Sequence, residues 1–562
     1  MYIGKDKIRG MMIKKSLYDR LLTFYKNNMC YDEEKRLKKQ QKKDANRAGR
    51  RGSAAPPLRL LSIPMTDNSE NLSATNAAPR PLRVAVVGAG PAGVYTSDIL
   101  LRQLKQRGPE LGLGDNATID LYEKLPVPFG LVRYGVAPDH PSIKFIQGAL
   151  AKTLNNPKIR LFCDVEFGKD VTLNEMRDRY DAIVFATGAV DDKPLRIPGH
   201  DANRVYGAAH FVEWYDGYPT GPRTWPLTDE AVAVIGGGNV AMDVARELVR
   251  NADDLLGTDI PNNVYDGIKS NACRELHLFV RRDVAHAKFS VQELRELEKL
   301  PGVQLIVNED DFDLSDETLE VAADDKLTRQ MVEELYAIRD MAEDMEYDGG
   351  TDFQGQPANK RYYLHFNSNP VEVLTDADGG VAGVRVERTE TTPDGKMSGT
   401  GETYDVPVQA VYHAIGYKPA AVNGVAYDDK GTRLLNVEGR IQTEPTADAA
   451  SETVPYVYAT GWAKRGPVGL IGSTKSDALE TVNNILDDWA ASGEAGRVAD
   501  KAGDEAEVLD YLRGKGLQPI GREGWDRVVA FEHAQGEKVG REHIKLVEPD
   551  QIRRVARGEE VA

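Results

Sequence analysis

From Pro81 onward, short apolar runs alternate with stretches of helical periodicity. The runs at 82–87 (LRVAVV), 117–123 (ATIDLYE), 180–188 (YDAIVFATG), 231–235 (AVAVI) and 274–282 (RELHLFVRR) are largely continuous. Such runs are typical of strands in a parallel sheet with both faces covered. Two of them, 82–87 and 231–235, lead through glycines into a helical pattern. The order predicts an α/β fold with parallel sheets.

The second half of the chain changes texture several times. Residues 311–347 are acidic and helix-like, and 361–410 alternate between apolar and polar positions as in an antiparallel sheet. The runs at 410–416 and 454–461 return to the parallel-strand pattern, and a helix is expected from about Ser473 to Trp489. Residues 491–562 are expected to form a helical appendage with glycine-rich breaks.

Composition places the chain among ordinary globular proteins. Of its 562 residues, 41% are hydrophobic and 28% are charged, which excludes a disordered or collagen-like chain. No apolar run reaches the ~18 residues that a membrane-spanning helix needs. The three cysteines, Cys30, Cys163 and Cys273, are too few and too scattered for a disulfide scaffold, a CxxC pair or a cysteine-ligated iron–sulfur cluster. We therefore expect a reducing, cytoplasmic location.

Charge is unevenly distributed along the chain. Residues 1–64 hold 17 basic and 6 acidic residues, a net of +11, which leaves −28 on residues 65–562. The strongly negative charge of residues 65–562 argues against a nucleic-acid partner, because it would repel phosphates. The basic head, residues 1–80, is excluded from the fold and expected to be disordered. It fits neither a transit nor a signal peptide well, and an alternative is that translation starts at Met65.

The first glycine loop, at residues 88–93, reads G-A-G-P-A-G directly after a strand. Its glycines allow a tight turn, close approach to a pyrophosphate, and close helix–strand packing. The helix that follows directs free N–H groups at the phosphates. Glu123 closes the next strand, where an acid binds a ribose hydroxyl. The pattern predicts a dinucleotide site, and a structural turn is the alternative.

The second loop, at residues 236–241, reads G-G-G-N-V-A and also joins a strand to a helix. The strand after it ends in Arg281 and Arg282 rather than in an acid. Adjacent guanidinium groups suit a ribose 2′-phosphate, which favours NADPH over NADH. Two dinucleotide sites in one chain indicate electron transfer between bound FAD and an exchangeable nicotinamide nucleotide.

These loops predict two Rossmann-like domains. The FAD-binding domain is expected at 81–190 and again at 410–490, and the NADP-binding domain is inserted at 191–409. Three further blocks narrow the interpretation: GLVRYGVAPDHPSIK at 130–144, RRDVAHAKFSVQELREL at 281–297 and GWAKRGPVGLIGSTKSDALETV at 461–482. With these blocks the chain resembles the adrenodoxin reductase family, whose bacterial members are FprA-like ferredoxin–NADP⁺ reductases, from about residue 82 to the C-terminus.

The resemblance implies roles for individual residues. For FAD, it places Gly88, Gly90, Ala92 and Gly93 at the pyrophosphate, Glu123 at the adenosine ribose, and Leu131 and Phe167 as main-chain or wall contacts to the flavin cofactor. Trp462 and the turn Gly469, Leu470 and Ile471 would lie beside the isoalloxazine. For NADP, the positions are Lys193, Gly237, Gly238, Asn239, Val240, Arg281, Arg282, Glu293 and Gly469. His140 and Glu296 match a polar pair used for proton handling, a task that suits a histidine and a carboxylate.

The chain departs from the family pattern at two charged positions. The block after the arginine pair usually reads RRGPxQAAF, and here it reads RRDVAHAKF. Asp283 therefore adds a negative charge next to the expected 2′-phosphate site. Lys193 stands where arginine is common, which keeps the charge and loses bidentate binding. Both departures predict a weaker preference for NADPH over NADH.

The resemblance implies that NADPH passes a hydride to FAD, which then gives single electrons to a small ferredoxin-like iron–sulfur protein. We expect a monomer with no nucleic-acid partner. The alternatives are an NADPH-dependent diaphorase or a glutamate-synthase small-chain-like donor, which would need N-terminal cysteine clusters. A disulfide reductase needs a CxxxxC pair, which the chain lacks. A binding protein without flavin, and a metal hydrolase, for which no HExxH spacing exists, are further alternatives that we do not favour.

Overall fold

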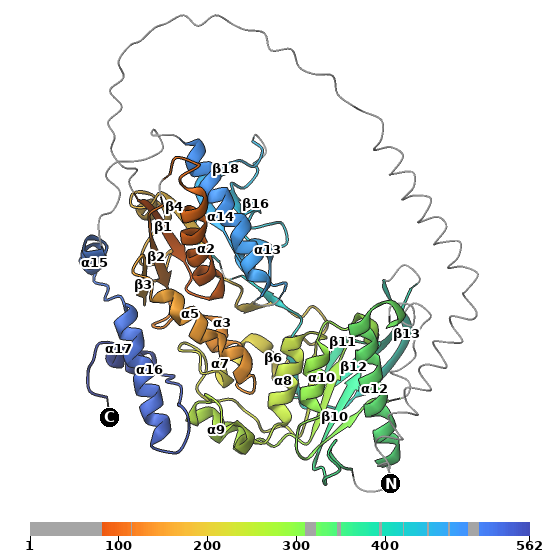
Figure 1. Ribbon diagram of the computed structural model, residues 1–562. Coiled ribbons are helices and arrows are strands. Elements are labelled where there is room, and N and C mark those ends of the chain that lie inside the picture. The colour runs from red at the N-terminus through yellow and green to blue at the C-terminus, as the bar shows by residue number, and fades with distance from the viewer. Residues whose placement is uncertain are drawn as a thin grey trace, which may run out of the picture.

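The computed structural model describes residues 81–562 except 114, 309–321, 346–349, 393–395, 420, 447–448, 470–471, 493–504 and 562. The basic head, its alternative start at Met65, and the predicted site residues Leu470 and Ile471 lie outside the described residues. Two lobes, each built on a largely or wholly parallel sheet, dominate the molecule (Figure 1). The predicted α/β fold is confirmed.

The first sheet has seven strands in the order β16-β17-β18-β4-β1-β2-β3. Five of them run parallel: β1 (Leu82–Val87), β2 (Ala117–Glu123), β3 (Ile159–Cys163), β4 (Ala182–Phe185) and β18 (Thr453–Ala459). Antiparallel β16 (Asn436–Val437) and β17 (Arg440–Gln442) form one edge. Helices α2 (Pro91–Arg107) and α14 (Ser473–Ala491) lie side by side against the sheet (Figure 1), with Val94, Leu100 and Val482 fully buried between them.

The second sheet has six strands in the order β6-β14-β7-β8-β10-β9, and every pair in it is parallel. Its strands are β6 (Val205–Gly207), β7 (Ala231–Ile235), β8 (Glu275–Phe279), β9 (Val303–Ile306), β10 (Lys360–His365) and β14 (Ala410–His413). Helices α7 (Ala208–Tyr215), α8 (Asn239–Val249), α9 (Asn262–Lys269), α10 (Val291–Leu297) and α12 (Lys326–Met345) belong to this lobe. Val234, Leu278 and Tyr362 are fully buried in its core.

Two boundaries predicted from the sequence were wrong. The run at 410–413 is β14 and pairs with β7, so the first domain does not resume at residue 410. Residues 360–365 are β10 in the parallel sheet, and the separate three-stranded antiparallel sheet is formed by β11 (Ser368–Thr375), β12 (Val381–Thr391) and β13 (Met397–Val406). A continuous apolar run shows that a strand is buried without showing which sheet it joins, because periodicity carries no information on pairing.

The two connections between the lobes pair with each other. Strand β5 (Asp191–Asp192) forms a short antiparallel ribbon with β15 (Tyr417–Lys418). The Asp192 carboxylate accepts hydrogen bonds from the Ala209 amide at the start of α7 (3.1 and 3.0 Å). The lobes are thus joined by a paired ribbon, and the second domain ends near residue 416 rather than 409.

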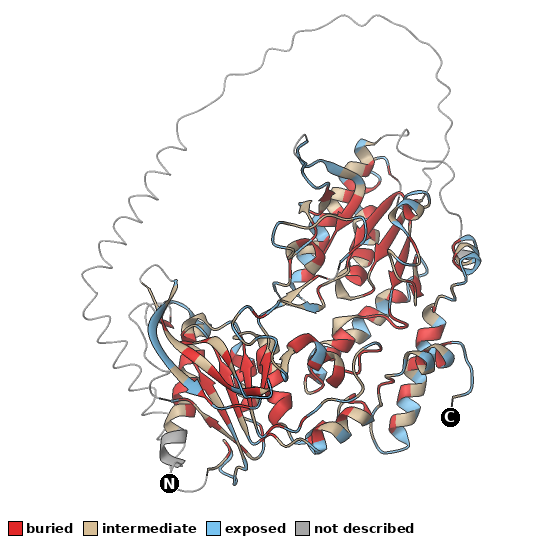
Figure 2. Cartoon of the chain, turned by 180° about the vertical axis from the view of Figure 1, so that it is seen from behind, coloured by how far each residue is buried: buried red, intermediate tan, exposed pale blue. Residues whose placement is uncertain are grey.

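The C-terminal residues are an integral part of the first lobe. Helices α15 (Glu505–Gly514), α16 (Arg522–Glu537) and α17 (Pro549–Ala556) follow the predicted helical pattern. Trp525 packs edge-on against Phe129 (5.5 Å between ring centroids), and Trp525, Val528 and Ile552 belong to the core of the first sheet. Figure 2 shows buried residues in α16 and α17 as well as in the two sheets.

The remaining helices are short: α3 (Leu131–Tyr134), α4 (Pro141–Lys144), α5 (Ile146–Leu154), α6 (Leu173–Arg177) and α13 (Trp462–Arg465), with 3-10 turns η1 (Ala252–Leu255) and η2 (Val284–His286). Within the described residues, no helix is both long enough and apolar enough to cross a membrane.

Candidate functional site

The first glycine loop has the geometry of a phosphate-binding turn. Gly88 has φ +110°, and a Cβ there would lie 2.5 Å from the Ala186 carbonyl oxygen. A Cβ at Gly93 would lie 2.0 Å from the Gly88 carbonyl oxygen. At Gly90, the N-cap of α2, a Cβ would meet nothing within 4 Å. Two of the glycines are therefore needed by the fold, whereas Gly90 leaves open space at the helix N-terminus for an anionic ligand.

Glu123 lies beside this loop at the end of β2. One carboxylate oxygen accepts from the Ala89 amide (2.9 Å) and the other from the Leu125 amide (3.0 Å). The residue is buried, and burial raises the pKa of the carboxyl group although both amides act against this. The two amides fix the carboxylate next to the glycine turn, where it could accept from the ribose hydroxyls of a dinucleotide.

The other predicted FAD residues come from distant segments. Leu131 begins α3, which is held to the loop by a hydrogen bond from the Phe129 amide to the Ala89 carbonyl (2.9 Å). Phe167 packs against Phe185, with 5.0 Å between the ring centroids. The ring centroids of Trp462 and of Tyr417, a residue of the linker ribbon, are 6.5 Å apart. Gly469, the first residue of the predicted turn, has φ +84°.

Two further observations test whether FAD fits here. Thr187 Oγ1, just after β4, is buried without a hydrogen-bond partner, a cost that a polar ligand would remove. Gly461 packs directly on Ala92, since a Cβ at Gly461 would lie 2.6 Å from that of Ala92. The Trp462 turn thus abuts the phosphate loop. The donors, the open face at Gly90 and the orphaned hydroxyl suit a dinucleotide such as FAD.

Sequence reasoning missed Asp477 of α14. Its carboxylate accepts from the Gly461 amide and lies 3.4 Å from both Lys464 Nζ and Arg465 Nη1. It therefore holds the turn that carries Trp462. An acid inside a charged helical run gives no sign of this contact, which depends on the packing of α14 against β18.

The second glycine loop repeats the arrangement on the second sheet. A Cβ at Gly236 would lie 2.5 Å from the Ala414 carbonyl oxygen, and one at Gly237 would lie 2.9 Å from Val280 Cγ1. Gly238 is the N-cap of α8 and, like Gly90, has nothing within 4 Å of its Cβ position. The predicted residues Asn239 and Val240 form the first turn of α8. This turn therefore also presents an open, glycine-lined helix N-terminus.

Glu293 and Asn239, predicted separately, are brought together. Asn239 Nδ2 donates to Glu293 Oε1 (3.3 Å), and Asn239 Oδ1 accepts from the Ser290 amide (3.2 Å). The segment between the arginine pair and α10 is thereby attached to the start of α8.

Arg281 and Arg282 follow β8, as the sequence predicts. Arg281 is exposed and Arg282 is half-buried. Thr389 Oγ1 donates a hydrogen bond to the Arg281 carbonyl, and the Asn367 amide donates one to the Arg282 carbonyl. Neither guanidinium forms an ion pair with an acid of the described residues. Two unpaired cations next to an open helix N-terminus suit a second phosphate group.

Asp283 occupies a different position from the one expected. It is buried and caps η2, accepting from the His286 amide (3.0 Å), from His286 Nδ1 (2.8 Å) and from Thr391 Oγ1 (2.7 Å). The negatively charged carboxylate of Asp283 therefore binds donors within the protein. Lys193, the other departure, lies on the linker ribbon, where its amide donates to the Gly416 carbonyl (2.9 Å).

His140 lies in a buried cluster of charges between the lobes. Its Nε2 is 3.1 Å from Asp243 Oδ1, 3.4 Å from Glu293 Oε2 and 2.7 Å from Arg246 Nη2. Burial alone would lower the pKa of His140, but the hydrogen bonds to Asp243 and Glu293 raise this pKa to about 10. The surrounding cluster contains four carboxyl groups and two guanidiniums, those of Asp139, Asp243, Glu247, Glu293, Arg246 and Arg250.

Glu296, the predicted partner of His140, faces other residues. Its carboxylate accepts from Lys299 Nζ (2.8 Å) and Gln292 Nε2 (2.6 Å). The acid of α10 that approaches His140 is Glu293, one helical turn earlier, and Asp243 of α8 approaches it as well. Asp243 and Arg246 were missed, although they lie on α8 at helical spacing from Asn239. Buried Arg246 also donates to Glu293 (3.1 Å), so it already supplies the positive charge that a metal at His140, Asp243 and Glu293 would bring.

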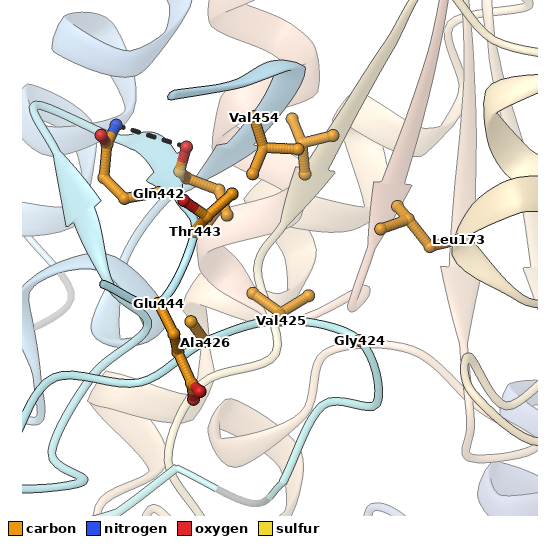
Figure 3. Close-up of a pocket in the computed structure, with 10 residues that line it drawn as sticks. Leu173, Gly424, Val425, Ala426, Gln442, Thr443, Glu444 and Val454 are labelled. Atoms are coloured by element: carbon orange, nitrogen blue, oxygen red, sulfur yellow. Dashed lines mark hydrogen bonds between the residues drawn. The ribbon is translucent and has the colours of Figure 1, made fainter. Parts of the chain in front are cut away.

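A surface groove of about 460 Å³ lies elsewhere, at the β17–β18 edge of the first sheet (Figure 3). Its walls come from residues 424–426, 441–444, Leu173, Val454 and Val457. It contains no predicted site residue, and we assign no function to it.

Comparison with known proteins finds a matching family model and similar chains. Residues 82–326 match the family model described as pyridine nucleotide-disulphide oxidoreductase. The chain is 33% identical to the NADPH-ferredoxin reductase FprA of Mycobacterium tuberculosis, over 85% of this chain and 100% of that protein. It is 34% identical to the human mitochondrial NADPH:adrenodoxin oxidoreductase, over 84% and 91% of the two chains. The structure of M. tuberculosis FprA in complex with NADPH matches with a TM-score of 0.75 at 32% identity, over 85% of this chain and 100% of that one.

Proposed function

This chain belongs to the adrenodoxin reductase and FprA family of flavoprotein oxidoreductases, and from that premise we propose that it is an FAD-dependent NADPH:ferredoxin reductase. The observation that carries the proposal is the pair of open glycine turns, at Gly90 and Gly238, on two sheets joined by one short ribbon. One nucleotide would be resident and the other exchangeable.

The first lobe would hold FAD. The turn at residues 88–93 would bind its pyrophosphate, Glu123 its adenosine ribose, and Thr187 and the Trp462 turn its isoalloxazine half. FAD would supply the chemistry that turns a two-electron hydride donor into a source of single electrons. Asp477 would keep the Trp462 turn in place through the Gly461 amide.

The second lobe would bind NADPH. The turn at residues 237–240 would take the pyrophosphate, and Arg281 and Arg282 the 2′-phosphate, because both guanidiniums are unpaired with any acid of the described residues. Glu293 would lie at the nicotinamide end, where Asn239 fixes it. Gly469 and Lys193 complete the expected set.

His140 would serve proton transfer and alignment together. Its imidazole belongs to the first lobe and its hydrogen-bond partners to the second, so its protonation depends on how the lobes are placed. Glu296 remains a proposed partner at longer range, since His140 contributes to a lowered pKa of Glu296 after the effect of Lys299 and Gln292.

The electron acceptor would be a small ferredoxin-like iron–sulfur protein. Relatives at 33% and 34% identity are named for ferredoxin and adrenodoxin as substrates. A glutamate-synthase-like donor is disfavoured because Cys163 and Cys273 are buried and 110 residues apart in sequence, which offers no cluster ligands. A monomer in a reducing cytoplasm remains our prediction.

The test is an anaerobic titration of the purified protein, followed by its visible flavin spectrum. We expect a yellow protein that NADPH bleaches stoichiometrically and that then reduces a [2Fe–2S] ferredoxin in single-electron steps. Bleaching by NADPH without ferredoxin reduction would support a diaphorase instead. A colourless protein that stays colourless after refolding with FAD would overturn the proposal.

A further inference from the structure

The segment after the arginine pair, residues 283–289, contains one lysine, Lys288. The same segment contains Asp283, whose carboxylate is bound internally by His286 and Thr391. The charge that this segment makes available to a ligand is therefore the positive charge of Lys288.

Lys288 is held directly against the second glycine turn. Its amide donates to the Gly237 carbonyl (2.8 Å), and two residues later the Ser290 amide donates to Asn239 Oδ1 (3.2 Å). The segment thus runs along the turn from the arginine pair to Glu293. Lys288 lies between these two ends, beside the glycines that face the pyrophosphate in such a turn.

The Lys288 side chain is exposed and has no ion-pair partner among the described residues. Among the described residues no acid forms an ion pair with its ammonium group, and the nearby acids have other partners: Asp283 binds His286, and Glu293 binds Arg246 and Asn239. A lysine anchored by its backbone to an open helix N-terminus, with a flexible stem and a free charge, can reach a phosphate above that turn.

We propose that Lys288 binds the pyrophosphate of the nicotinamide nucleotide, in addition to the 2′-phosphate contacts of the arginine pair. The inference rests on the proposed function, because it assumes that the second turn is the nicotinamide-nucleotide site. It assigns the two charged groups different tasks. Lys288 strengthens the binding of any dinucleotide, whereas Arg281 and Arg282 distinguish NADPH from NADH.

The experiment is equilibrium binding of NADP⁺, NAD⁺ and 2′,5′-ADP to the flavin-loaded protein by calorimetry, in wild type, K288Q, K288R and K158Q. Lys158 is an exposed lysine just before β3, at the sheet end opposite the glycine loops, so K158Q is the matched control. We expect K288Q to weaken NADP⁺ and NAD⁺ by the same factor, about five- to tenfold, with K158Q unchanged and K288R close to wild type.

Each other outcome has a distinct meaning. A loss confined to NADP⁺ and 2′,5′-ADP, with NAD⁺ unchanged, would place Lys288 on the 2′-phosphate and overturn the proposal. Equal binding by K288Q and wild type would also overturn it. If wild type itself binds none of the three ligands, the proposed function has failed rather than the role of Lys288.

Discussion

His140 and Asp243 form a hydrogen bond between the two lobes, with 3.1 Å between Nε2 and Oδ1. His140 is the N-cap of α4, and at the other end of that helix Lys144 reaches Asp216 (2.7 Å) and Asp259 (2.9 Å) of the second lobe. Both ends of one four-residue helix are thus bound across the lobe boundary. The site and the alignment of the lobes share these contacts.

The first prediction concerns the pH dependence of His140. Because the pKa of His140 is raised from 6.5 to about 10 in the folded protein, its stabilising contribution is complete below pH 6.5 and is lost as the pH rises through 10. H140Q should lower the free energy of unfolding at pH 6 by about 2 kcal/mol. The difference from wild type should shrink toward pH 10, measured by urea unfolding. A difference independent of pH would contradict the assignment.

The glycines of the first loop are predicted to differ in what they support. G93A should prevent stable folding, at a cost above about 3 kcal/mol, because its Cβ would lie 2.0 Å from a backbone oxygen. G90A should fold normally, since nothing lies within 4 Å, yet lose bound flavin. Thermal unfolding and the flavin-to-protein absorbance ratio separate the two effects. A G90A protein with full flavin content would remove Gly90 from the cofactor site.

Some of this organisation can be predicted from sequence and some cannot. The strand at 82–87 and both glycine turns were predictable, because they depend on local patterns of apolar residues and glycine. Asp243, Arg246 and Lys545 were not. Lys545 lies in the predicted appendage, yet its buried Nζ is 2.9 Å from Asp259 and 3.2 Å from Asp216. Buried ion pairs between distant segments leave no periodic signal.

The cluster around Asp259 gives a prediction for the C-terminal segment. Its carboxylate is buried between Lys144 and Lys545, which hold the pKa of Asp259 well below its usual range against the effect of burial. D259N should destabilise the protein by about 3 kcal/mol, whereas D550N, at an exposed acid of α17 paired with Arg553, should cost under about 0.5 kcal/mol. Because a depressed pKa stabilises above the unfolded value, the D259N cost should diminish as the pH falls below about 4.

The arginine pair gives a prediction about nucleotide choice. R281Q and R282Q should each raise the KM for NADPH by about ten- to thirtyfold and leave that for NADH within about twofold. Stopped-flow reduction of the flavin with each nucleotide provides the measurement. Raised salt should weaken NADPH binding in wild type more than in an R281Q/R282Q double variant, because fewer charges remain to be screened in that variant. Equal losses for both nucleotides would mean that the pair does not bind the 2′-phosphate.

The last prediction separates two roles of Asp283. As a repulsive charge, it would lower the preference for NADPH, and both D283N and D283G would raise that preference. As the cap of η2 it stabilises the turn by accepting from the His286 amide and side chain. The burial of its carboxylate and the third donor, Thr391 Oγ1, favour the second role.

D283G should therefore lose about 1 to 2 kcal/mol of stability, and D283N, which keeps an acceptor, should lose less. Neither should change the NADPH-to-NADH ratio of kcat/KM by more than about twofold, since the charge that leaves is already surrounded by donors. A tenfold rise in that ratio for D283N would show that the charge governs nucleotide choice after all.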